Sequence, residues 1–222
     1  TAPELYTLKR EAFTNDGLTI PAIWTDSATY GVQRTDWQRA LMGGTGKVNN
    51  ADLAIRGGNA NSNYSFSGNY YDEKGLITNS YFKRYSARFN SEHKLGGRIR
   101  VGENFQYSSR SSSSPDTRSS FTGLVWSALR FNPAIPVMNA DSTWGSSKVD
   151  NELGDINNPV YTATVNNIYN TNTSLLANAY LEIEPVRGLK IRGNLGYDNE
   201  ANESYNFSPA TPDQTRVQSL DD

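Results

Sequence analysis

The chain has 222 residues, a formal charge of −2, one histidine and no cysteine. This near-neutral charge gives no basic face for nucleic acid, and the lack of cysteine excludes disulfides, thiolate zinc sites and cysteine catalysis. The mean hydropathy of −0.65 and the absence of a long apolar run exclude transmembrane helices, but not a transmembrane barrel, whose strands alternate apolar and polar residues.

The N-terminal part predicts short helices. Residues 3–14 carry apolar side chains at helical spacing, and Asp16 and Gly17 end the pattern. Residues 36–41 predict one further helical turn, which the glycines at 43–46 break. There is no initiator methionine or signal peptide at the start, and the end is polar. We expect a segment of a longer chain rather than a processed secreted domain.

From about residue 50 the apolar residues recur with a period of two, which predicts β-strands. Gly96 and Gly97 predict a two-residue hairpin turn between two of these strands. The six predicted strands are 51–58, 62–71, 81–95, 98–108, 173–184 and 189–198.

Strand length and loop length both indicate a membrane barrel. Globular strands average about 5–6 residues, whereas ten residues tilted by about 45° span about 23 Å, close to the apolar band of an outer-membrane barrel. Short turns also alternate with longer connections, as they do in such barrels. The predicted fold is all-β, part of a large antiparallel transmembrane β-barrel whose extracellular loops carry short helices. The alternative is a soluble antiparallel sheet with one face exposed to solvent.

This fold divides the chain into barrel strands and extracellular loops. We expect an extracellular loop region with short helices at 1–50, four barrel strands at 51–108, a long extracellular loop with a helix near 119–131 at 109–172, two barrel strands at 173–198, and the start of a further extracellular loop at 199–222.

The alternation also predicts which side chains face lipid and which face the lumen. Phe66, Phe89, Phe105 and Leu195 are predicted to face lipid, while the lumen is predicted to receive Arg88, Asn104 and Asn194. Glu103 breaks the pattern, because it alternates with apolar residues on the predicted lipid face. We expect it to lie near an interface or at a bulge, since a lipid-facing carboxylate is penalised less there.

Several segments keep a characteristic order and spacing. They are Thr35–Gln38, Leu53–Asn59, Asn63–Asp72 with Gly75, Tyr81–Leu95, Val101–Asn104, Leu129–Val137, and Gly188–Arg192 with Gly196 and Tyr197. In these segments the chain resembles the barrel region of SusC/RagA-type TonB-dependent outer-membrane transporters. The resemblance covers most of the chain and is strongest between Asn63 and Ser86. Glu103 departs from it, because the family often has glycine there.

The resemblance implies a barrel of about 22 strands in the bacterial outer membrane, in contact with its lipid and filled by a plug that contacts TonB. It also implies a SusD-like surface lipoprotein as partner, an oligosaccharide or peptide substrate, no catalysis and no cofactor. This chain would supply about a quarter of the wall. The alternative function is that of a soluble carbohydrate-binding or adhesin β-domain acting through surface aromatics.

Two groups of residues are candidates for function. The charged side chains that alternate inward would line the lumen or hold the plug: Arg84, Arg88, Arg100, Lys190 and Arg192. Trp126, Arg130 and Trp144 are candidate substrate contacts, because indole rings stack on sugars and guanidinium binds carboxylates or hydroxyls. Packing against neighbouring loops or the lid is the alternative for these three residues.

The predicted helix at 119–131 is amphipathic. We expect one stripe of it to pack on the barrel mouth, formed by Phe121, Leu124, Val125, Ala128 and Leu129.

Two further patterns are better explained by structure than by function. His93 beside Glu92 is interpreted as a solvated or interfacial histidine in preference to a proton relay. Asp150, Glu152 and Asp155 could gather around calcium, but no EF-hand pattern is present, so a hydrated loop is favoured. No metal site is predicted.

Overall fold

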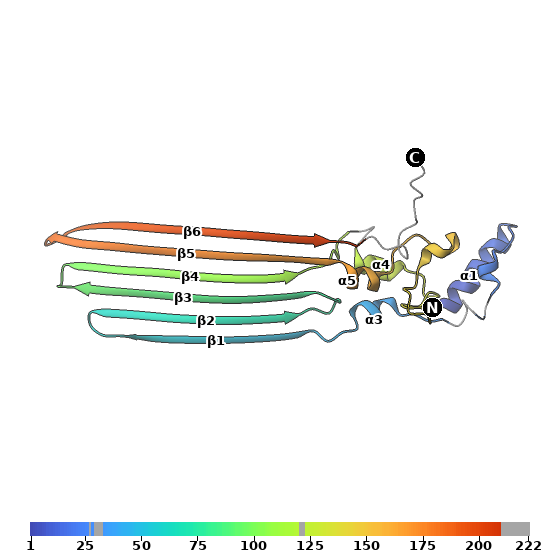
Figure 1. Ribbon diagram of the computed structural model, residues 1–222, viewed down its shortest axis with the longest axis horizontal. Coiled ribbons are helices and arrows are strands. Elements are labelled where there is room, and N and C mark those ends of the chain that lie inside the picture. Colours follow the sequence, from blue (N-terminus) through green and yellow to red (C-terminus); the bar gives the residue numbers. More distant parts are fainter. Residues whose placement is uncertain (27, 29–32, 120–122, 210–222) are drawn as a thin grey trace, which may run out of the picture.

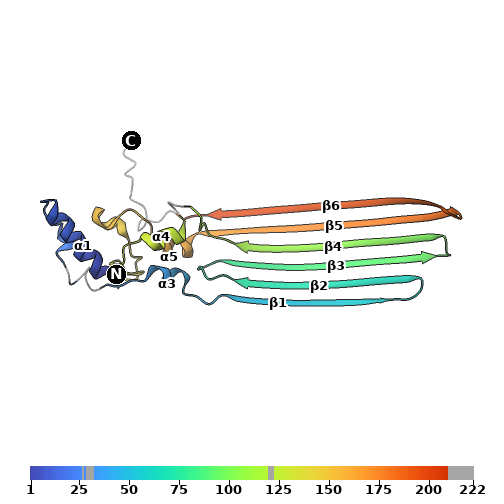
Figure 2. The same cartoon turned by 180° about the vertical axis from the view of Figure 1, so that it is seen from behind.

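The protein is one long, open, antiparallel sheet with a layer of short helices and loops at one end (Figure 1). The computed structural model describes residues 1–26, 28, 33–119 and 123–209. The strand order is β1-β2-β3-β4-β5-β6, so every strand pairs with its neighbours in the sequence. Figure 2 shows the same arrangement from behind, and in both views the described helices leave the two faces of the sheet uncovered. The predicted all-β fold with six long strands is confirmed.

Most of the strands are longer than predicted. Their bounds are β1 Lys47–Gly58, β2 Ser62–Lys74, β3 Tyr81–Leu95, β4 Ile99–Ser113, β5 Asn167–Val186 and β6 Leu189–Phe207. Most of the added residues lie at the end where the strands meet the helices, and there both faces carry mainly Ser, Thr, Asn and Tyr. The alternation of apolar and polar residues is lost in such segments although the backbone hydrogen bonds between the strands continue. Alternation alone therefore underestimates the length of the strands.

The sheet has two different ends, named here the turn end and the loop end. Residues 59–61, 96–98 and 187–188 connect the strands at the turn end, and the helices lie at the loop end. Gly96 and Gly97 have φ of 57° and 73°, which glycine adopts without strain. Leu95 pairs with Ile99, so three residues form this hairpin, and the predicted two-residue turn is wrong.

The two faces of the sheet differ in chemistry. One row of paired residues, running across all six strands, is Ile55, Phe66, Phe89, Phe105, Ala177 and Tyr197. The next row, whose side chains point the other way, is Arg56, Ser65, Asn90, Asn104, Asn178 and Gly196. We call these the apolar face and the polar face. Leu195 belongs to the apolar face, while Arg88 and Asn194 belong to the polar face, as the alternation predicted.

Short helices make up the loop layer. They are α1 Ala2–Asn15, η1 Ala22–Trp24, α3 Trp37–Met42, α4 Leu124–Arg130, η2 Ser147–Val149, η3 Asn151–Leu153 and α5 Pro159–Val165. Both predicted N-terminal helices are confirmed. The Asp36 side chain caps α3 by accepting a hydrogen bond from the Arg39 amide at 2.9 Å. No helix in the described part of the chain has the length and apolar character needed to cross a membrane.

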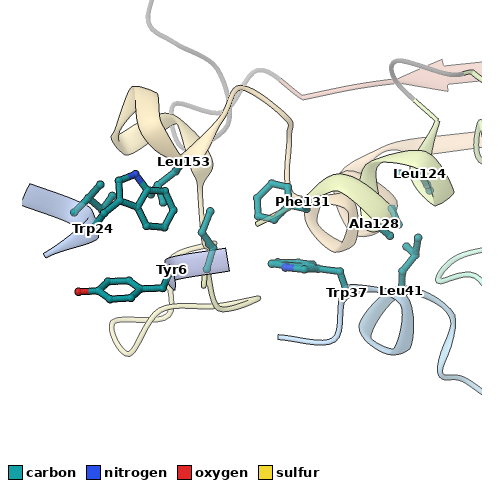
Figure 3. Close-up of a cluster of buried hydrophobic side chains, with 11 residues drawn as sticks. Tyr6, Trp24, Trp37, Leu41, Leu124, Ala128, Phe131 and Leu153 are labelled. Atoms are coloured by element: carbon teal, nitrogen blue, oxygen red, sulfur yellow. The ribbon is translucent and has the colours of Figure 1, made fainter. Parts of the chain in front are cut away.

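The hydrophobic core lies in the loop layer and not in the sheet (Figure 3). Trp24 is fully buried there. The centres of the Trp37 and Phe131 rings lie 4.5 Å apart in a T-shaped contact, and the Trp37 indole nitrogen donates to the Asn132 carbonyl at 3.0 Å. The core therefore joins residues that precede the first strand to residues from the long connection between β4 and β5.

Helix α4 differs from its prediction. It begins at Leu124, and Phe121 lies outside the described residues. The buried positions are Leu124, Ser127 and Ala128, whereas Leu129 is 54% exposed. The packed face is thus shifted from the predicted stripe, because α4 packs on α3 and α5 within the loop layer.

Candidate functional site

A cavity of about 660 Å³ lies where the loop layer meets the strand ends. Its walls come from α4, α5, η2, the segment after β4, and the start of β5. Leu124 and Ser127 line it from α4, and Ala163 lines it from α5. The cavity therefore sits between the loop core and the rim of the sheet.

Both signs of charge line this cavity. Arg130 stands at the end of α4 and Lys148 in η2, while Asp116 follows β4 and Asp155 precedes α5. The Asp116 carboxylate also accepts backbone hydrogen bonds within its own loop at 3.0 and 3.2 Å. Among the described residues that line the cavity, none is aromatic.

The candidate substrate contacts are separated by the structure. The Arg130 guanidinium lies 5.9 Å from the centre of the Trp126 ring, and Trp126 is 42% exposed. Trp144 lies elsewhere, in a T-shaped contact with Tyr161 whose ring centres are 5.5 Å apart. Arg130 and Trp126 therefore form one unit beside the cavity, whereas Trp144 packs inside the loop layer.

The five charged residues predicted to face the lumen all lie on the polar face, and each has a partner there. Arg84 donates to Asn69 at 3.1 Å, and Arg88 donates to Gln106 at 2.6 Å. The ion pairs of this face include Arg100–Glu92 at 3.7 Å and Lys190–Glu182 at 3.9 Å. Arg192 lies over the Tyr180 ring at 3.8 Å.

Tyr180 was not singled out from the sequence, yet it links three strands of the polar face. Its hydroxyl donates to Glu92 on β3 at 2.6 Å, passing across β4. The crossing is possible because Gly102 lies directly opposite Tyr180, and a Cβ at position 102 would overlap the tyrosine ring. A glycine paired with an aromatic residue on the next strand is the sequence signal that could have revealed this contact.

The stagger of the turns gives the tilt of the strands. Ser62 pairs with His93, two residues before the end of β3, and Ile99 pairs with Ile183, three residues before the end of β5, so each turn extends two to three residues beyond the previous one. Figure 1 shows the turns stepping outward from β1 to β6. Over two strand spacings this offset corresponds to a tilt of about 40°, within the range of transmembrane barrels.

Tyrosines mark one common height on the apolar face. Tyr70, Tyr85, Tyr107 and Tyr197 each lie roughly ten residues from their turn, which is about 33 Å along the strand and about 25 Å along the axis of a barrel with this tilt. Tyr70 and Tyr85 pair directly, with ring centres 5.1 Å apart. We call these four residues the tyrosine belt. Its height above the turns equals the apolar band of an outer-membrane barrel.

Glu103 lies in a regular part of the sheet. Its pairing with Ser91 and Ala179 continues the registers on both sides without interruption, so the bulge considered from the sequence is absent. By the same geometry it stands about 15 Å above the turns, inside the apolar band.

The loop layer also holds a polar turn around Asp141. The hydroxyl and the amide of Thr143 donate to this carboxylate at 2.7 and 3.0 Å, and these hydrogen bonds hold the pKa of Asp141 below its usual range. The described residues contain no group of three or more histidine and acidic side chains placed to hold a metal ion.

No known family model matches this chain. It is similar to TonB-dependent receptor P3 of Formosa agariphila, with 31% identity over 195 residues that cover 85% of this chain and 19% of that protein. TonB-dependent receptor P26 of the same organism is 24% identical over 204 residues, covering 91% of this chain and 19% of that protein. The chain spans about a fifth of the length of these relatives.

Solved structures show the same fold. The RagAB peptide importer in its closed-closed state superposes with a TM-score of 0.58 at 19% identity, covering 85% of this chain and 23% of that chain. Its open-open state gives a TM-score of 0.57 at 20% identity, covering 82% of this chain and 20% of that chain. The resemblance to SusC/RagA-type TonB-dependent outer-membrane transporters is confirmed: over most of its length the chain is similar to TonB-dependent receptors, and it shares the fold of part of the RagAB importer. These receptors are outer-membrane proteins of Gram-negative bacteria, so the outer-membrane location predicted for the chain is confirmed.

Proposed function

We propose that this receptor segment forms part of the wall and of the extracellular vestibule of an outer-membrane importer. The apolar face contacts lipid, and the polar face lines the lumen and holds the plug through Arg84, Arg88, Arg100, Lys190 and Arg192. The tyrosine belt is the observation that carries this proposal, because tyrosines at one height flank an apolar band of membrane thickness. Beyond the belt both faces of the strands carry mainly polar residues, which suits water on both sides. The chain itself carries out no covalent chemistry.

The partners that the resemblance implies are compatible with this orientation. The loop layer stands at the extracellular end of the wall, so it is the part of this segment that a SusD-like lipoprotein would cover. Energy would reach the importer through TonB and a plug inside the barrel. The charged pairs at the turn end of the polar face, such as Arg100–Glu92 and Lys190–Glu182, are the groups that such a plug would meet.

The cavity at the rim favours a peptide over a neutral oligosaccharide as substrate. Arg130 and Lys148 can hold carboxylates, and Asp155 can hold an ammonium group, whereas sugar stacking requires aromatic rings. No aromatic residue is among the described residues that line the cavity. Trp126 stands beside Arg130 and would contact the substrate at the cavity's edge. The structurally similar RagAB complex is a peptide importer, which agrees with this choice. Trp144 remains a weaker candidate contact.

Cysteine labelling of the full-length receptor tests the orientation. Cysteines replacing Phe66, Phe89 or Leu195 should react with a membrane-soluble maleimide, and cysteines replacing Asn104 or Asn194 should react with a water-soluble one. A reversed pattern would refute the membrane orientation.

Uptake measurements test the substrate. In cells expressing the full-length receptor, Arg130→Gln should lower the uptake of labelled peptides and leave oligosaccharide uptake unchanged. Arg187→Gln, at a turn on the opposite end of the sheet, is the matched control. A loss of oligosaccharide uptake alone would overturn the assignment to peptides.

A further inference from the structure

Four polar side chains are linked across three strands on the apolar face. They are Ser62 of β2, Ser91 and His93 of β3, and Glu103 of β4. The His93 ring bridges the two serines, with Nε2 at 2.8 Å from the Ser91 hydroxyl and Nδ1 at 3.0 Å from the Ser62 hydroxyl. The Ser91 hydroxyl also donates to the Glu103 carboxylate. Ser91 is only 8% exposed, so this link is shielded from solvent.

The surroundings of this group are apolar. Glu103 alternates along its strand with Val101 and Phe105 and pairs with Ala179 on β5. Tyr64, opposite Ser91, is the neighbouring titratable residue on β2. The other charged side chains of this face in the described strands, such as Lys83 and Asp72, lie beyond the tyrosine belt. His93 is therefore the group within reach that can compensate the carboxylate.

The donors of this group have one consistent order. A carboxylate only accepts hydrogen bonds, so the single hydrogen of the Ser91 hydroxyl points to Glu103. Ser91 must then accept from His93, which places a hydrogen on Nε2. The other ring nitrogen, Nδ1, lies 3.0 Å from the Ser62 hydroxyl, which can either accept a hydrogen bond from it or donate one to it. From His93 through Ser91, the donors are thus directed toward the carboxylate.

We propose that Ser62, His93, Ser91 and Glu103 form a polar anchor, in which Ser91 and His93 position and compensate a carboxylate inside the lipid-facing wall. The anchor rests on the proposed contact between the apolar face and lipid. It also fixes the registers of β2, β3 and β4, because a slip of one residue would turn these side chains to opposite faces and break the chain of hydrogen bonds. Polar groups in a membrane gain stability when they find each other in this way.

A double-mutant cycle in the full-length receptor tests the anchor. We expect Ser91→Ala to raise the unfolded fraction roughly tenfold, since it leaves the carboxylate without its donor, a change of about 1.4 kcal/mol. Glu103→Leu should be tolerated, because it removes the group that needs compensation. In the Glu103→Leu background, Ser91→Ala should then cost clearly less, because only its hydrogen bond with His93 is left to lose. Urea titration in lipid bilayers, followed by heat-modifiability on gels, measures each folded fraction.

Two further variants define the outcomes. Ser109→Ala, on the same face of β4 beyond the tyrosine belt, is the matched control, and His93→Leu should behave as Ser91→Ala does. The anchor is overturned if Ser91→Ala costs no more than Ser109→Ala, or if it costs as much in the Glu103→Leu background as in the unmodified receptor. If a cysteine at position 66 reacts with the membrane-soluble maleimide but the double-mutant cycle shows no coupling between Ser91 and Glu103, the anchor alone is refuted. If that cysteine reacts with the water-soluble maleimide instead, the lipid contact is refuted, and the compensating role of the anchor with it.

Discussion

Replacing Phe66 by arginine should destabilise the receptor strongly. Phe66 lies in the apolar row between Ile55 and Phe89. It stands roughly six residues from its turn, which is about 15 Å along the axis of a barrel tilted by about 40°. The apolar band extends from the turns to the tyrosine belt, so position 66 lies close to the middle of the membrane. A guanidinium group there has neither water nor a phosphate group within reach.

The expected magnitude follows from this depth. Arginine on the lipid face costs about 2–4 kcal/mol at the midplane and about 0–1 kcal/mol near the interfaces. Phe66→Arg should therefore shift the folding equilibrium by roughly 30- to 700-fold. Leu189→Arg, on the same face beside the turn 187–188, should shift it by roughly fivefold or less.

Urea titration of the full-length receptor in lipid bilayers, with heat-modifiability as the readout, measures these shifts. Asn178→Arg is the control for the opposite face, because Asn178 lies in the polar row beside Asn104; it should leave the folded fraction close to that of the unmodified receptor. Equal costs at positions 66 and 189, or a larger cost at position 178, would refute the assignment of faces and depth.

Three further outcomes are expected. Gly102→Ala should destabilise the wall by about 1–3 kcal/mol in urea titration, since the new methyl group overlaps Tyr180, whereas Gly193→Ala, which meets open space, should be tolerated. Trp37→Ala should cost the loop core about 3–5 kcal/mol, seen as faster proteolysis of the loop layer without loss of heat-modifiable strands. The lowered pKa of Asp141 stabilises its turn at neutral pH and ceases to do so as the pH falls through that pKa, so local amide protection should drop on acidification and be insensitive to pH in Asp141→Asn.

The central strand segments could be predicted because one physical contrast governs them. Phe66, Phe89 and Phe105 alternate with polar residues wherever the two faces of the sheet meet different surroundings, and there the period of two is clear. Toward the loop end both faces meet similar surroundings, so the contrast disappears. The strands continue to Phe207 on β6 because backbone hydrogen bonds, which do not depend on the side chains, hold them.

The site residues also divide into those that the alternation predicts and those that it does not. Arg88 and Arg192 could be placed on the polar face from their position in the alternation alone. The contact between Trp37 and Asn132, 95 positions apart in the sequence, could not be predicted, because it depends on how two loops meet in space. The anchor around His93 was missed for a related reason: its members are ordinary residues in their own strands, and only the register brings them together.

The shared core of the loop layer has a consequence for exchanging parts between related receptors. The segment before β1 and the connection between β4 and β5 hold each other through Trp37 and Asn132, Thr35 and Ile135, and Trp24 and Glu152. A chimera that transplants one of these segments would leave indole and hydroxyl donors facing a surface that evolved for another partner. The two segments should therefore be transplanted together as one unit, while the strands beneath them are left unchanged.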